Sequence, residues 1–310
     1  MLTVLKTALE VGLIYGLVAL ALFISFSILN IADLSTDGCF TLGCAVGAML
    51  TIAGHPILAL FAAMAAGMLS GYITAFLQTR LGVESILAGI ISNTGLYTIN
   101  LAVMGFSSNV SITGVDTVFS LFKGLVGGQW SRLILLALIA AVIVFVLIRF
   151  FGTSLGLSIR ATGDSLDMVS ASSINPKATI TIGLCLANAL TALSGCLIGE
   201  YNKFCDINLG TGMVTIALAS LIIGEVFAGR RGSVGKRVVC VVLGSIVYRF
   251  IIALALRLNI SAEYFKLVSA VIVAVAIAAP NMKDYVHLAK IKSNARKLRA
   301  LSGKGDETDA

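Results

Sequence analysis

The chain has 310 residues, of which 58% are hydrophobic and 12% are charged, and its formal net charge is +7. Because a soluble domain is only roughly half apolar, this composition excludes an ordinary water-soluble globular protein and predicts an integral membrane protein. An unpaired backbone amide in lipid costs several kcal/mol, so the membrane-spanning elements are expected to be helices.

Apolar runs recur along almost the whole chain. At about 1.5 Å per residue, roughly twenty residues in a helix cross the hydrocarbon core of about 30 Å. We predict an all-α polytopic membrane protein with about nine transmembrane helices; eight or ten stay open because 35–53 and 84–104 contain several polar residues and glycines. The predicted spans are 8–29, 35–53, 56–79, 84–104, 132–150, 178–199, 213–229, 238–257 and 265–280.

The segment after the first predicted span, residues 30–50, combines acidic side chains with small residues. Gly43 and Gly47 are four positions apart, a spacing of small residues that lets two helices approach closely. The polar residues before them are candidates for a translocation path; they are Asn30, Asp33, Ser35 and Asp37. The alternative is a cytoplasmic turn in which the carboxylates only cap the start of a packing helix.

Two further polar pairs lie inside predicted spans, Asn93 with Thr94 in the fourth and Asn188 with Thr191 in the sixth. An amide or hydroxyl in the middle of a membrane is expected to face protein or water and not lipid. These four residues are therefore also candidates for the translocation path. The alternative for each pair is a simple hydrogen bond between helices, which contributes about 0.6 kcal/mol.

Two glutamates and the six cysteines of the chain are expected to have structural roles and not chemical ones. Glu200 and Glu225 lie near the ends of predicted spans, so we expect them at the membrane interface, since a charge in the interior costs about 2.5–3.5 kcal/mol. The six cysteines include no Cys-x-x-Cys pair and have no nearby pair of histidines, so they are expected to be small buried hydrophobic residues.

A polar, turn-bearing stretch, residues 151–179, separates two long apolar runs. We call it the island. A helix is predicted from Leu157 to Ser172, polar on one side, and lying at the membrane face. Its apolar contribution comes from Leu166, Met168, Val169 and Ala171. The pair Asn175-Pro176 is expected to end this helix, because proline has no amide hydrogen and disfavours helical geometry in the residue before it.

Lysine and arginine gather in three clusters of the predicted loops. They are Arg149, Arg160 and Lys177 around the island; Arg230, Arg231, Lys236 and Arg237; and Lys283, Lys290, Lys292, Arg296, Lys297, Arg299 and Lys304 in the tail. Two predicted spans separate each cluster from the next, so all three can share one side, which the bias of basic loops identifies as the cytoplasm. The positive charge is thus assigned to topology and to anionic lipid, and no nucleic acid partner is expected.

Enzymatic signatures are absent from the sequence. His55 and His287 have no neighbouring nucleophile or metal partner. The string GRRGSVGKR, residues 229–237, differs from a phosphate-binding loop in its glycine spacing, in the residue after Lys236 and in following an apolar helix. No catalytic residue, cofactor or metal is therefore predicted in this chain, and any ATP hydrolysis is expected on another subunit.

The island carries a family resemblance. GTSLG at 152–156, SIRATGDSLDMVSASSINPKATI at 158–180 and LANALTALSGCLIGE at 186–200 resemble the cytoplasmic-loop signature of the branched-chain amino acid permease superfamily of ABC importers, which includes ribose-type permeases. Arg160, Ala161, Asp164, Ile174 and Asn175 match the pattern, and Ser173 replaces the usual glycine. The glycine-rich stretch 210–245 is also similar, but it departs at Glu225 and in its spacing from Gly224 to Gly232.

This resemblance implies a permease domain over 1–282, with a coupling-helix loop at about 151–177 and a basic cytoplasmic tail at 283–310. The island would be the coupling helix that docks on an ATPase subunit. By the resemblance its coupling residues would be Arg160, Gly163, Asp164, Asp167, Met168, Ala171, Ile174 and Asn175.

The same resemblance implies the partners. They would be a second permease copy, identical or homologous, cytoplasmic ATPase subunits that hold ATP-Mg, and an extracytoplasmic solute-binding protein, all at the cell membrane. The solute would be an amino acid or a similar small compound. Two other classes stay open: a secondary transporter driven by an ion gradient, which carboxylates at broken helices in mid-membrane would favour, and a structural membrane subunit.

Overall fold

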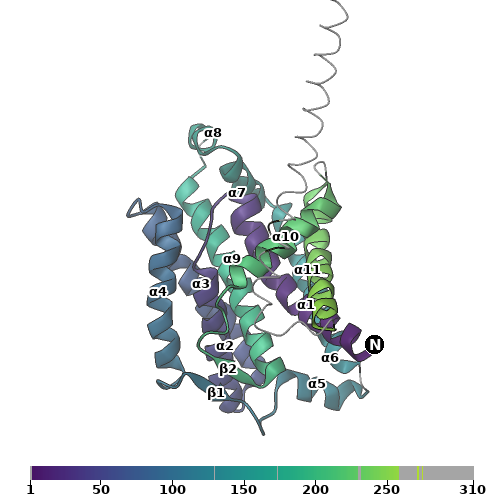
Figure 1. The fold of residues 1–310 in the computed structure, drawn as a ribbon. Coiled ribbons are helices and arrows are strands. Elements are labelled where there is room, and N and C mark those ends of the chain that lie inside the picture. Colours follow the sequence, from purple (N-terminus) through teal and green to yellow (C-terminus); the bar gives the residue numbers. More distant parts are fainter. Residues whose placement is uncertain are drawn as a thin grey trace, which may run out of the picture.

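The computed structural model describes residues 2–128, 130–172, 174–229 and 232–257, together with Val271 and Ala274. Figure 1 shows this part of the chain as a bundle of long helices with short elements at both ends. The tail 283–310 and nearly all of the predicted span 265–280 lie outside the described residues. The predicted helical, multi-pass membrane class is confirmed, since six helices are long and apolar enough to cross a membrane.

The described helices follow one another with short connections. They are α1 (Leu2–Leu22), the π-helical η1 (Phe23–Ile28), α2 (Thr36–Ile52), α3 (Pro56–Thr79), α4 (Ser85–Val103), α5 (Val118–Val126), α6 (Ser131–Phe151), α7 (Ser154–Asp164), α8 (Leu166–Ala171), α9 (Pro176–Asn202), α10 (Met213–Ala228) and α11 (Val234–Arg257). Two short strands, β1 (Asn109–Ser111) and β2 (Phe204–Asp206), pair antiparallel with Val110 opposite Cys205.

The predicted count of nine spans is not confirmed. The six candidate spans among the described residues are α1 with η1, α3, α4, α6, α9 and α11. The predicted spans 35–53 and 213–229 instead form the shorter apolar helices α2, of 17 residues, and α10, of 16 residues. Both are short because they begin inside the bundle and not at its surface. The segment 84–104, in contrast, forms one continuous helix, α4.

Helix α9 forms the centre of the bundle. Of its most apolar stretch 83% is buried, against 22% for α6. Small residues let α2 and α3 approach it closely: a Cβ at Gly43 would overlap the backbone of Ala192, and one at Gly71 would overlap the carbonyl of Leu184. The predicted role of Gly43 in close helix packing is thus confirmed.

The described chain uses one packing scheme twice. Helix α3 packs on α9, and in the same way α11 packs on α1, where the Ser245 hydroxyl donates to the Gly12 carbonyl at 2.8 Å. The short helices α2 and α10 pack on α3 and α11 respectively. One set is α1, α2 and α3, and the other is α9, α10 and α11. The corresponding helices of the two sets run in opposite directions across the bundle, as Figure 1 shows, which is the arrangement of an inverted repeat.

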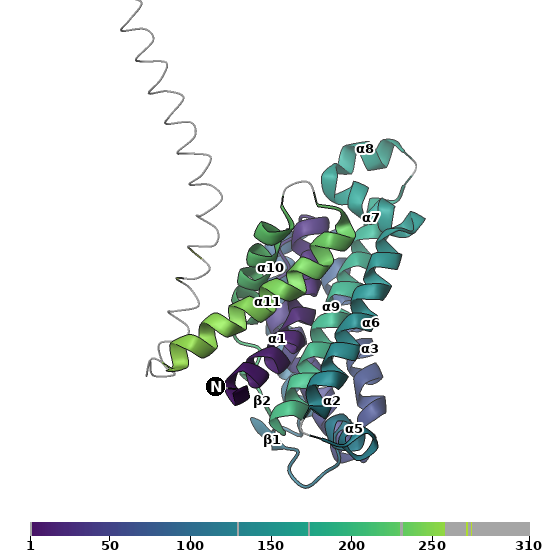
Figure 2. The ribbon, with the colours of Figure 1, turned by 90° about the vertical axis from the view of Figure 1, so that its right-hand side faces the viewer.

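One end of the bundle carries α7, α8, the connection 80–84, the end of α10 and the start of α11; we call it the island end. Arg80 lines a recess there with Asn175 and Lys177, and Gly235 lies against Ile148 at the end of α6. The amino terminus lies at the opposite end (Figures 1 and 2). The turn that carries Arg80, the island and the start of α11 therefore share one end. For the island and for Lys236 and Arg237, this agrees with the side that their basic residues predict.

Candidate functional site

The connection between η1 and α2 carries acidic residues into the middle of the bundle. Asp33 lies beside Asn188, near the middle of α9, and the Gly38 carbonyl accepts a hydrogen bond from Asn100 of α4. The alternative of a turn at the cytoplasmic surface therefore does not fit the position of these residues. Because Asn30 adopts a left-handed φ of 56°, the chain turns away from η1 and runs back inward before α2 begins.

The Asp33 carboxylate is buried and fully engaged. Its Oδ1 accepts from the backbone N–H of Ser35 at 2.8 Å and from the Ser35 hydroxyl at 2.6 Å, and its Oδ2 accepts from Nδ2 of Asn188 at 2.9 Å. A charge is stable in the interior only when donors of this kind surround it. Asp33 therefore fixes the start of α2 against α9, which supports the capping alternative for this residue.

Asp37 caps a helix distant in sequence. Its Oδ2 accepts from the Gly212 backbone N–H at 2.9 Å, and its Oδ1 accepts from the Val214 N–H at 2.8 Å. These are two of the unpaired donors at the start of α10, where a negative charge is stabilised by the helix dipole. The carboxylate thus holds the beginning of α10 against the beginning of α2.

A recess of about 330 Å³ opens beside Asp37, between α2, α4 and the connection that leads into α10. We call it the polar recess. It is lined by Asp37, Gly38, Thr41, Asn93, Thr94, Tyr97, Asn100, Ile207, Asn208 and Thr211. Three predicted path residues, Asp37, Asn93 and Thr94, come together here.

The other predicted path residues lie elsewhere. Ser35 and Asp33 are buried, and Asn188 and Thr191 are each only 1% exposed. The Thr191 hydroxyl donates to the Ala187 carbonyl in its own helix. Asn30 is exposed at the island end, next to the contact between η1 and α7. These five residues do not line the polar recess.

Sequence reasoning missed Tyr97 and Asn100, although a signal was present. Asn93, Tyr97 and Asn100 follow one another at spacings of four and three residues, which puts them on one face of a helix. The Asn100 side chain donates to the Gly38 carbonyl at 3.0 Å, while its buried Oδ1 has no hydrogen-bond partner among the described residues.

The polar recess opens on the outer surface of the single chain at mid-depth. Tyr97 is 52% exposed, Thr94 is exposed and Asn93 is half-buried, all near the middle of α4. Amide, hydroxyl and phenol groups at this depth lose their hydrogen bonds to water if lipid covers them. This face is therefore suited to contact with water or another protein.

The island forms two helices, so the predicted single helix from Leu157 to Ser172 is wrong. Helix α7 ends at Asp164, Ser165 is extended with φ −160°, and the Ser165 hydroxyl oxygen accepts from the Met168 backbone N–H at 3.3 Å. The serine thus starts a new helix because its side chain replaces a backbone acceptor.

The pair Asn175-Pro176 likewise has a different role from the one expected. Asn175 Oδ1 accepts from the Lys177 backbone N–H at 3.0 Å, and Pro176 occupies the first turn of α9. Proline is favoured at the start of a helix because its missing amide hydrogen would have no partner there. The pair therefore begins α9.

The island projects beyond the spanning helices (Figures 1 and 2). Of its predicted coupling residues, five are exposed and three are half-buried: Asp164, Asp167, Met168, Ala171 and Asn175 in the first group, Arg160, Gly163 and Ile174 in the second. Val169 is buried, whereas Leu166 and Met168 are 53% and 58% exposed. The surface of α8 thus combines apolar and acidic side chains.

Close contacts attach α7 to the bundle. A Cβ at Gly156 would overlap the Phe150 carbonyl, and one at Gly163 would overlap the Ile28 carbonyl. The hydroxyls of Thr162 and Thr179 are 2.8 Å apart and join α7 to α9. A movement of α7 therefore acts directly on η1, α6 and α9.

The two glutamates near helix ends differ from each other. Glu200 lies near the end of α9 and is only 1% exposed, so the expectation that its charge avoids burial is wrong. Its carboxylate accepts from the Val118 backbone N–H at 2.8 Å and from the Thr51 hydroxyl at 3.1 Å. Helix α5 covers it, since the carboxylate caps the start of that helix. Glu225 is half-buried at the island end and pairs with Arg237.

The chain is similar to a family of transport permeases and to two known proteins. The family described as "branched-chain amino acid transport system / permease component" matches residues 4–277. The chain is 30% identical over 294 residues to a tyrosine transport system permease protein of Clostridioides difficile (strain R20291), covering 94% of this chain and 95% of that protein. It is 31% identical over 284 residues to an uncharacterised protein of Rickettsia prowazekii (strain Madrid E), covering 91% and 99%. No solved structure matches it.

Proposed function

Because this chain belongs to the family of branched-chain amino acid transport system permeases, we propose that it is the membrane-spanning permease subunit of an ATP-binding cassette importer. Its solute is an amino acid or a similar small compound, since a relative at 30% identity is named as a tyrosine transport permease. The observation that carries the proposal is the polar recess at mid-depth on the outer surface of α4.

The polar recess would form part of the translocation path. Its amide, hydroxyl and phenol groups offer a passing solute hydrogen bonds at the depth where lipid offers none. A second permease copy facing this surface would enclose the recess and keep lipid away from Asn93, Thr94 and Tyr97. The path would then lie between the two copies, in the cell membrane, with the solute delivered by an extracytoplasmic binding protein.

The island would dock on an ATPase subunit that holds ATP-Mg. Its exposed Leu166 and Met168 supply apolar contacts, and Asp164 and Asp167 supply charges for basic partners. Its attachment through Gly156 and Gly163 would convert a movement of the ATPase into movement of the bundle. The island end would then be cytoplasmic, in agreement with its basic residues.

A secondary transporter is the competing class, because Asp33 and Asp37 lie at mid-depth beside the interruption between η1 and α2. Both carboxylates are already engaged, however, Asp33 by Ser35 and Asn188 and Asp37 by the start of α10. An ion or proton bound there would displace hydrogen bonds that hold α2 and α10. The geometry therefore favours the ATP-driven class.

The energy source distinguishes the two classes. The complete transporter in sealed vesicles, with ATP on the ATPase side and no ion gradient, is expected to accumulate solute presented with the binding protein. Uptake of labelled tyrosine and of a panel of amino acids measures this. Uptake that needs an ion gradient and ignores ATP would contradict the proposal.

Solvent access tests the path. In the assembled transporter, Thr94→Cys is expected to react with a membrane-impermeant thiol reagent, because the polar recess would be filled with water. Leu138→Cys on α6, whose native side chain is 54% exposed and apolar, is the matched control and should stay unlabelled in lipid. The native cysteines are buried or half-buried, so the unsubstituted chain sets a low background. Labelling of both positions, or of neither, would contradict the assigned path.

A further inference from the structure

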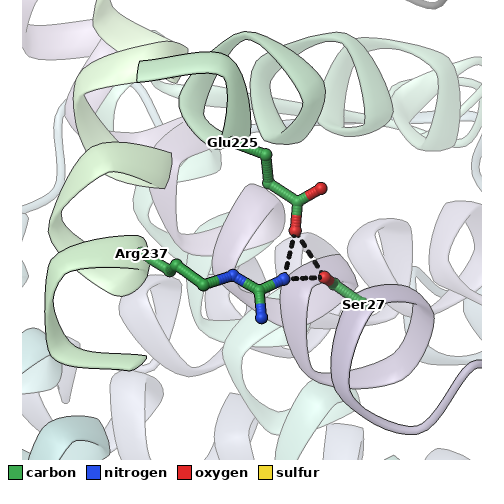
Figure 3. Close-up of polar contacts among 3 residues, drawn as sticks. All are labelled: Ser27, Glu225 and Arg237. Atoms are coloured by element: carbon green, nitrogen blue, oxygen red, sulfur yellow. Dashed lines mark hydrogen bonds and ion pairs between the residues drawn. The ribbon is translucent and has the colours of Figure 1, made fainter. Parts of the chain in front are cut away.

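A polar cluster at the island end joins three elements of the bundle. Arg237 Nη2 lies 2.6 Å from Glu225 Oε1 and donates to the Ser27 hydroxyl oxygen at 2.6 Å, while that hydroxyl donates to the same glutamate oxygen (Figure 3). Ser27 belongs to η1, Glu225 to α10 and Arg237 to α11. We call these three residues the cluster.

The cluster is built to hold its elements together. The side chains of Arg237 and Glu225 are 28% and 35% exposed, so water screens their attraction less than it screens that of a fully exposed pair. The guanidinium Cζ also lies 5.1 Å from the centroid of the Phe23 ring, which adds a cation–π contact to η1. Arg237 therefore binds η1 in two places and α10 in one.

Helix η1 departs from the ordinary α-helical register. Its backbone bonds follow the wide register, as in Leu29 N–H to the Ile24 carbonyl at 3.0 Å. Such turns are rare, and they recur at functional sites. Return to the ordinary α-helical register would rotate Ser27 relative to α1 and pull its hydroxyl away from Glu225 and Arg237.

The far end of η1 touches the island. A Cβ at Gly163 would overlap the Ile28 carbonyl and lie 3.0 Å from the Cα of Leu29, so the backbones of α7 and η1 are in direct contact. Packed interiors compress very little, so a shift of α7 toward the bundle must displace the end of η1. That end is one residue from Ser27.

The opposite end of α10 lies at the polar recess. Glu225 is in the last turn of α10, and the first turn of the same helix is held by the Asp37 carboxylate. A helix moves as a rigid rod over this length, so a force on Glu225 also acts on the Asp37 contact. A continuous series of contacts thus runs from α7 through η1, the cluster and α10 to the polar recess.

We propose that η1 and the cluster transmit the movement of the island to α10 and the polar recess, with Ser27, Glu225 and Arg237 as positioning residues for transport. The proposal rests on the docking of an ATPase on the island. It gives a role to Glu225, where the chain departs from the pattern of the family that it resembles. Arg237 is the residue that stabilises this departure.

The test compares uptake with ATP hydrolysis in vesicles that contain the complete transporter. Ser27→Ala, Glu225→Gln and Arg237→Gln are each expected to lower ATP-driven uptake about tenfold while hydrolysis continues. The double variant Ser27→Ala with Glu225→Gln should show the same uptake as the less active of the two single variants, because both substitutions disrupt one network. Asp116→Asn removes an exposed carboxylate at the opposite end and should leave both rates unchanged.

The outcomes separate this proposal from the proposed function. Absence of ATP-driven uptake by the unsubstituted chain would contradict the importer itself. If the unsubstituted chain is active and all three single variants show normal uptake, the proposed transmission through η1 and the cluster would be wrong, while the importer would stand. That transmission would also be contradicted if uptake and hydrolysis fell together in proportion to the loss of folded protein, measured by gel filtration. Such a result is the signature of a purely structural contact.

Discussion

Met168→Asp in α8 is expected to reduce ATP-driven uptake at least about a hundredfold while the chain still inserts and folds. Met168 is 58% exposed and projects from the island, so the substitution disturbs little buried surface of the isolated chain. In the proposed complex its side chain would be buried against the ATPase. A carboxylate buried there without a partner costs about 3 kcal/mol or more, and each 1.4 kcal/mol is a tenfold change in affinity.

Co-purification of the ATPase and uptake in vesicles measure this effect. Met168→Leu keeps the apolar surface at nearly the same volume and should behave like the unsubstituted chain. Asp164→Arg tests the charge of the same surface and is expected to uncouple hydrolysis from uptake. Normal uptake by both Met168→Asp and Asp164→Arg would contradict docking at the island.

The sequence was sufficient for the class of the protein and for most spans, because hydropathy over some twenty residues reports whether a helix is stable in lipid. It could not report the depth at which a helix begins. Residues 213–229 are as apolar as a full span, yet α10 starts inside the bundle because Asp37 caps it from α2. That contact joins residues 175 positions apart, and no local pattern contains it.

The candidate path residues separate into two groups in the structure, and the reason lies in tertiary contacts. Asn93 and Thr94 line the polar recess because they lie on the open face of α4. Asn188, which looks equivalent in sequence, is buried by its bond to Asp33. Asn93 and Asn188 are both amides near the middle of an apolar helix. Only the neighbouring helices therefore distinguish a residue that lines the recess from one that packs in the interior.

From the sequence, a helix-capping role and a path-lining role for the acidic residues are alternatives. In the structure, one residue can combine capping with lining the recess. Asp33 is a cap and is closed off from the polar recess. Asp37 caps α10 and lines the polar recess at once. One carboxylate therefore links the position of a helix to the wall of the proposed path, and movement of α10 would change that wall.

Gly43→Val is expected to prevent folding of most of the chain. The new side chain would overlap the backbone of Ala192, and a backbone in the central helix α9 cannot turn aside as a flexible side chain can. Overpacking of a core costs about 1–3 kcal/mol even where side chains can move, a large part of a total stability of about 5–15 kcal/mol.

Gly95→Val in α4 is the matched control for this effect. It introduces the same side chain into another apolar helix, at a position where a Cβ meets nothing within 4 Å. The monodisperse fraction in detergent, measured by gel filtration of fluorescently tagged protein, should fall about tenfold or more for Gly43→Val and stay near that of the unsubstituted chain for Gly95→Val. Equal fractions for the two variants would mean that α2 does not pack on α9 backbone to backbone, and the depth assigned to Asp33, Asp37 and the polar recess would then be wrong.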